Sequence, residues 1–117
     1  MDLMEISKKI QDTMLEIATD KGKLNALYAE ESRLESILTQ KKAITMMGLR
    51  NGKPYTLQNE DVHNPPVTLI PDIVKGICWQ EILDRDIASG NCKATETNIR
   101  ALLAILNGYQ TIHKHLD

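Results

Sequence analysis

Apolar residues recur along the first 47 residues at spacings that alternate between three and four. The positions are Leu3, Ile6, Ile10, Met14, Ile17, Leu24, Leu27, Leu34 and Leu38. This spacing keeps one apolar stripe along a helix, as in a coiled-coil heptad. Polar residues interrupt the heptad frame at Thr13, Asp20, Glu31 and Lys41. The pattern predicts a long amphipathic, coiled-coil-like helix over residues 2–47.

Gly22 is the position at which this predicted helix is most easily bent or broken. A glycine inside a helix costs ~1 kcal/mol, so a helical hairpin that breaks near Gly22 is the alternative. The apolar stripe keeps its phase from Ile17 to Leu24, and we therefore favour continuity. A helix over residues 2–47 is ~69 Å long, whereas a compact domain of about 100 residues has a radius of gyration near ~13 Å. The rest of the chain cannot cover such a helix, so we expect it to pair with another protomer.

Residues 48–70 lack helical periodicity and contain two glycines and three prolines. The dipeptide Asn51-Gly52 is the one that two-residue hairpin turns prefer. It predicts a small β-hairpin in which residues 45–49 face residues 53–57. We expect the rest of this segment to be an extended loop, and loops of this length are often functional.

Two more helices are predicted in the C-terminal part, over residues 71–88 and 96–116. Pro71 and Asp72 suit the first turn of the former, and the segment Ser89 to Asn91 is expected to end it. Trp79 is interpreted as a core or interface anchor of this helix. The latter helix is apolar around most of its circumference between Ile99 and Leu106, which is typical of a buried central helix. The prediction is an all-α fold, with residues 1–117 as one helical domain.

Composition adds a reason to expect self-association. The chain has 42% hydrophobic residues but only 3% aromatic ones, with no phenylalanine. Large rings each remove ~150–250 Å² from water, so burial per residue is modest here. We expect a homodimer or a higher oligomer to complete the core.

The net charge of −2 hides an uneven distribution. Residues 36–59 contain four basic residues and no acidic one, whereas the segments on both sides are acidic. The proposed ligand-binding residues are Lys41, Lys42, Thr45, Arg50, Asn51, Lys53 and Tyr55. Cations, neutral hydrogen-bonding groups and the backbone amides of Gly48 and Gly52 are what an anion site needs. The alternatives are a solvated linker and a surface that binds an acidic protein.

Other chemistry finds little support in the sequence. It contains no metalloprotease, nucleophile-elbow, Walker or paired-cysteine motif, and we expect neither an enzyme nor a bound metal or cofactor. The second and third helices carry too few basic residues to read DNA. No apolar segment is long enough to span a membrane. With acidic residues at its start and two isolated cysteines, Cys78 and Cys92, the chain is predicted to be cytoplasmic.

The leading functional hypothesis is a non-enzymatic homo-oligomer that captures or sequesters an anionic ligand, such as a nucleotide, through its basic segment. The alternative is a small helical regulator or inhibitor that binds a protein target through exposed helix faces. A structural oligomer without a ligand is the third class. The sequence matches no family motif that would choose among them.

Overall fold

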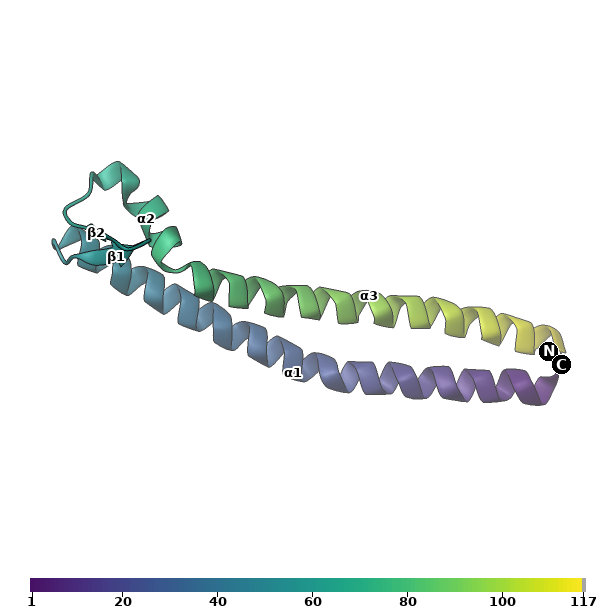
Figure 1. The fold of residues 1–117 in the computed structure, drawn as a ribbon. Coiled ribbons are helices and arrows are strands. Elements are labelled where there is room, and N and C mark those ends of the chain that lie inside the picture. The colour runs from purple at the N-terminus through teal and green to yellow at the C-terminus, as the bar shows by residue number, and fades with distance from the viewer. Residues whose placement is uncertain (117) are drawn as a thin grey trace. The chain divides into compact units, whose positions relative to one another are not determined.

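The computed structural model describes residues 1–116 and contains three α-helices and one β-hairpin (Figure 1). Helix α1 spans Leu3–Arg50, and the hairpin strands are β1, Tyr55–Leu57, and β2, Glu60–Val62. A 3-10 turn at Val67–Leu69 leads into α2, Ile70–Ile77, and α3 follows at Trp79–Leu116. The predicted mostly helical fold with a long first helix is confirmed, and α1 continues through Gly22 without a break.

The chain divides into two compact units. Unit 1 comprises residues 1–29 and 90–117, and unit 2 comprises residues 30–89. Each unit therefore combines part of α1 with part of α3.

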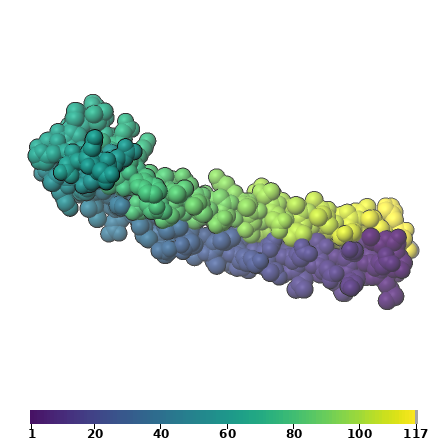
Figure 2. Space-filling model, viewed as in Figure 1, coloured from purple at the N-terminus to yellow at the C-terminus, as the bar shows by residue number. Residues whose placement is uncertain are grey.

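In unit 1, the N-terminal part of α1 lies beside the C-terminal part of α3, as the purple and yellow segments show in Figure 1, and their atoms are in contact in Figure 2. The heptad stripe of α1 forms this contact: Ile6 and Ile17 are buried, as is Ile99 from α3. Two of the polar interruptions have partners here. The hydroxyl of Thr13 donates to the carbonyl of Lys9 at 2.7 Å, and the carboxylate of Asp20 accepts a hydrogen bond from Asn98.

Unit 2 contains the larger apolar core. Its buried members are Leu38, Leu49, Ile70, Val74 and Cys78. The heptad stripe of α1 supplies the first of these residues, and α2 closes the core from the other side. Lys41, another polar interruption of the stripe, also has a partner: its ammonium group donates a hydrogen bond to Glu81 of α3 at 2.5 Å.

Part of the apolar stripe of α1 packs within the chain, since Ile6, Ile17 and Leu38 are buried, whereas Leu3 and Met14 of the same stripe remain exposed. The expectation of a partner chain rested on the length of this helix compared with a compact domain, and residues 71–88 and 96–116 were predicted to form two separate helices. Instead, α3 runs for 38 residues through the predicted break at Ser89 to Asn91. Ala88 and Cys92, on either side of Gly90, are both buried. Their packing outweighs the ~1 kcal/mol that a glycine costs inside a helix.

The actual break lies at Cys78, where the backbone leaves the helical region at φ −91° and ψ 17°. Cys78 still donates to the carbonyl of Val74 and accepts from the amide of Ile82. Because these hydrogen bonds remain, the chain changes direction there at little cost. No sequence signal marks the position, since a buried cysteine is neither a cap nor a helix breaker.

The hairpin also differs from the predicted one. Residues 45–49 are helical, and the strands pair Tyr55 with Val62 and Leu57 with Glu60. The turn is formed by Gln58 and Asn59, both at positive φ, 51° and 64°, as a two-residue hairpin with the right-handed twist requires.

Asn51 and Gly52 end α1 instead. Gly52 has a φ of +81°, its amide donates to Leu49, and the next amide, of Lys53, donates back to Gly48. This is the Schellman arrangement at a helix C-terminus, which favours glycine as strongly as a hairpin turn does.

Candidate functional site

The first part of the basic segment lies on α1. Lys41 is bound to Glu81, and Thr45 is buried in unit 2. The hydrogen bond and charge of Lys41 lower the pKa of the Glu81 carboxyl, although its burial acts in the opposite direction. Lys42 is half-buried, as Lys41 is. Two of the proposed ligand-binding residues therefore serve the packing of unit 2.

The backbone amides that were expected to bind an anion already donate hydrogen bonds to backbone carbonyls. The amide of Gly52 donates to Leu49, and that of Asn51 donates to Met47 and Gly48. The amide of Gly48 lies inside α1, where amides bond to carbonyls one turn earlier. The end of α1 also presents the negative end of the helix dipole. The expectation of a phosphate-binding backbone at these glycines is wrong, because the same residues terminate a helix.

Arg50 and Lys53 remain exposed after α1 ends. Within residues 1–116, neither side chain forms an ion pair with a carboxylate. Arg50 lines a hollow of about 350 Å³ together with Asn64 and the apolar residues Leu49, Pro65, Val67 and Ile70. Lys53 lies over the ring of Tyr55, with its ammonium nitrogen 5.3 Å from the ring centre, which is within cation–π range.

The ring of Tyr55 packs against Gly48 of α1 so closely that a β-carbon would not fit there. The hairpin is thereby held on α1 by an aromatic ring, with Lys53 on top of it. The structure thus brings Lys53 and Tyr55 together, as the sequence proposed. Asn51 is exposed at the helix end.

A second surface of unit 2 is apolar. Trp79, Leu83 and Ile87 follow one another at intervals of four along α3, and their exposed fractions are 61%, 46% and 54%. We call these three residues the Trp79 patch. Trp79 also borders a hollow of about 540 Å³ between the hairpin and α2, lined in addition by Thr56, Leu57, Gln58, Gly76 and Ile77.

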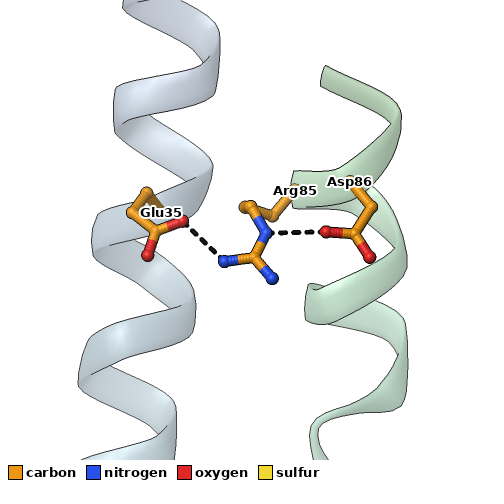
Figure 3. A network of polar contacts seen from close by, with 3 residues as sticks. All are labelled: Glu35, Arg85 and Asp86. Carbon is orange, nitrogen blue, oxygen red and sulfur yellow. Dashed lines mark hydrogen bonds and ion pairs between the residues drawn. The ribbon is translucent and has the colours of Figure 1, made fainter. Parts of the chain in front are cut away.

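On another side of α3, Arg85 is bracketed by two carboxylates (Figure 3). Its guanidinium donates to Glu35 of α1 and to Asp86, both at 2.8 Å. The hydrogen bond to Glu35 has the largest effect on the pKa of Arg85, and together with the hydrogen bond to Asp86 it raises that pKa. The three residues border a polar hollow of about 570 Å³ with several serines. Because the cation is already paired with both acids, this cluster serves the pairing of α1 with α3.

The comparisons with known proteins do not assign a function. No family model matches the chain, and no significant match was found among curated proteins or solved structures. Within residues 1–116, no group of three or more histidine, cysteine or acidic side chains is arranged to hold a metal ion. None of the helices in this range is long and apolar enough to cross a bilayer.

Sequence reasoning underrated the Trp79 patch. Trp79 was interpreted as a core or interface anchor, and the structure leaves it exposed while Cys78 and Ala88 are buried. The i, i+4, i+8 spacing of the three exposed residues was visible, but the burial of the other face was not. That choice depends on where α1 and α2 pack.

Proposed function

We propose that this chain is a non-enzymatic helical protein that acts by binding another protein through the Trp79 patch. The observation that carries the proposal is the 61% exposure of the only tryptophan, next to two further exposed aliphatic side chains. Tryptophan is the residue type most enriched at binding hot spots. In a folded chain, an exposed apolar patch of this kind marks an interaction surface.

The patch also indicates the chemistry of the partner. The hollow beside Trp79 is lined mostly by uncharged residues of the hairpin and α2, so it suits an apolar side chain rather than a charged one. An amphipathic helix or an apolar loop of a target protein, with one large side chain for the hollow, fits this surface. The proposed role is that of a regulator or adaptor.

The experiment is affinity capture with the full chain, compared with two variants. We expect the double substitution Trp79→Ala and Leu83→Ala to weaken binding of the captured protein by about 30-fold or more, the cost of losing a hot spot. Arg50→Ala with Lys53→Ala is the matched control on the basic segment and should leave binding unchanged. When purified target is added, the fluorescence of Trp79 should shift to shorter wavelength. Equal capture by the wild type and the patch variant would refute the proposal.

An anionic ligand is the second candidate, and it is favoured by Arg50 and Lys53, two cations without an ion pair among residues 1–116. Arg50 lines a hollow of its own, and Lys53 with Tyr55 offers a charge above a ring. A nucleotide would place its phosphates near Arg50 and its base near Tyr55. Because Lys41 is paired and the glycine amides are occupied, this site relies on fewer groups than the sequence suggested.

Calorimetry against a panel of nucleotides at two salt concentrations tests this second candidate. We expect binding at low salt that weakens as salt screens the charges, and its loss in the variant Arg50→Ala with Lys53→Ala. The Trp79 patch variant should bind as the wild type does. No heat at low salt, or unchanged binding by the double variant, would exclude the site. For either candidate we propose a cytoplasmic location, because the two isolated cysteines, Cys78 and Cys92, are typical of a chain in a reducing compartment.

A further inference from the structure

The hollow beside Arg50 combines a cation with apolar walls. Its volume is about 350 Å³, and it is lined by Leu49, Arg50, Asn64, Pro65, Val67 and Ile70. That volume lies at the lower end of the range of roughly 300–1,000 Å³ that is typical of small-molecule sites. Leu49 and Ile70 are each 2% exposed, whereas Arg50 and Val67 are exposed. The hollow therefore has a buried apolar floor and an open rim that carries one charge.

One wall of this hollow is formed by a restrained loop. Asn64 has a φ of 46°, and its side-chain oxygen lies 3.0 Å from the position that a β-carbon of Gly52 would occupy. Because Gly52 belongs to the turn that ends α1, the side chain of Asn64 rests on the end of that helix. The next residue, Pro65, has its φ fixed near about −65° by its ring. The loop is thus held against α1, and the hollow is pre-formed, as small-molecule sites usually are.

Arg50 is available for a ligand. Among the described residues that line the hollow it alone is charged, and its side chain forms no ion pair within residues 1–116. A cation in the last turn of a helix also interacts favourably with the helix dipole, and that role explains Arg50 alone. It does not explain Val67, an aliphatic side chain on the same hollow that is 73% exposed. The pair indicates a ligand with both an anionic group and an apolar part.

The charges at the hollow favour a monoanion. The planar guanidinium of Arg50 carries one positive charge, and its donors match the two oxygens of a carboxylate. The end of α1 is the negative end of the helix dipole, which disfavours the second negative charge of a phosphate monoester. Lys53 does not line the hollow, because its ammonium group lies over the ring of Tyr55. A carboxylate therefore suits the hollow better than a phosphate does.

The remaining lining suits a hydrocarbon. It consists of one polar residue, Asn64, and of aliphatic or proline side chains, namely Leu49, Pro65, Val67 and Ile70. A sugar or a nucleobase placed there would give up hydrogen bonds to water without replacing them, which is unfavourable. An alkyl group has no such bonds to lose, and its burial removes apolar surface from water.

We propose that this hollow binds a small carboxylic acid with an alkyl tail. The carboxylate pairs with Arg50, and the tail lies against Leu49, Val67 and Ile70. Because the tail excludes water from the hollow, it also strengthens the ion pair beside it. The inference rests on the second candidate function, an anionic ligand at Arg50, and names the chemical class of that ligand.

Titration of the isotope-labelled full chain with hexanoate, followed by NMR, tests the proposal. We expect the amide signals of Leu49, Asn64 and Ile70 to shift. The dissociation constant should fall about fourfold for each methylene added from butanoate to hexanoate, the factor that corresponds to about 0.8 kcal/mol per buried methylene. Hexylammonium has the same tail with the opposite charge and should leave these signals unchanged.

Two pairs of variants locate the site. Arg50→Ala should weaken hexanoate binding about tenfold or more, the cost of losing a hydrogen bond to a charged group. Lys53→Ala is its matched control, because it removes a cation of the same segment that does not line the hollow. Val67→Asp places a negative charge on the rim and should weaken binding likewise. Thr68→Asp, at the next exposed residue outside the lining, should change it little. Circular dichroism verifies that the variants remain folded.

Three outcomes would overturn the proposal. They are the absence of amide shifts with hexanoate, equal dissociation constants for the wild type and Arg50→Ala, and equal effects of Val67→Asp and Thr68→Asp. An affinity that does not depend on the length of the tail would also exclude the hollow, but would leave the anion at Arg50 in place. The second candidate function fails separately, because its nucleotide calorimetry compares a variant that lacks both Arg50 and Lys53.

Discussion

Leu38→Ala is expected to lower the free energy of unfolding by about 2–5 kcal/mol. Leu38 is 1% exposed, in the core of unit 2 that it shares with Leu49, Ile70, Val74 and Cys78. Truncation removes apolar contacts and leaves a cavity that the surrounding structure closes only in part. Urea unfolding followed by circular dichroism measures the change.

Ile37→Ala is the matched control for this prediction. Ile37 is the preceding residue on the same helix, but 40% of it is exposed. Its truncation removes the same number of carbons from a largely solvated position, so we expect a loss below about 1 kcal/mol. Comparable losses at both positions would mean that α1 does not present Leu38 to the core.

Gly76→Val is expected to destabilise the protein by about 1–3 kcal/mol. A β-carbon at Gly76 would lie 3.1 Å and 3.3 Å from the two methyl carbons of Leu57. The glycine is therefore the point at which α2 receives strand β1. A branched side chain there has to push the hairpin away from α2, which exposes Leu57 and widens the hollow beside Trp79.

Gly22→Val separates this steric effect from helix propensity. Gly22 also lies in a helix, but a β-carbon there would have open space around it. Because valine is a somewhat better helix former than glycine, this control should leave stability unchanged or raise it slightly. Thermal unfolding of both variants gives the comparison. Gly76→Val fails the prediction if its midpoint is at or above that of the wild type.

The heptad stripe of α1 could be predicted from the sequence because it depends on residue spacing alone. Its polar interruptions were visible too, but their partners were not. Thr13 bonds within its own helix, whereas Asp20 and Lys41 find Asn98 and Glu81 on α3. Such pairs join residues about 40 to 80 positions apart in the chain, and no local pattern predicts which polar residues will face each other.

The local turn signal at Asn51-Gly52 was also ambiguous. Asn51-Gly52 suits both a hairpin turn and a helix end, because each needs a residue at positive φ. Helix α1 continues to Arg50, and Asn51-Gly52 then forms its cap. The hairpin then uses Gln58 and Asn59, although neither is glycine.

The basic segment shows how a candidate site changes between sequence and structure. Its charge could be counted from the sequence, and Arg50 and Lys53 are exposed and unpaired with carboxylates in the described chain. Tertiary packing decided that Lys41 neutralises Glu81 and that Thr45 is buried.

The sequence by itself determined that the chain is helical, that its first helix is long, and where the apolar stripe of that helix runs. These properties follow from residue spacing and backbone preference, which act over a few residues. Only the tertiary structure decided which residues of the stripe are buried, that the break falls at Cys78, and that Trp79 is left exposed. An amphipathic pattern states that a face will be buried, but which neighbour buries it depends on packing between segments distant in the chain.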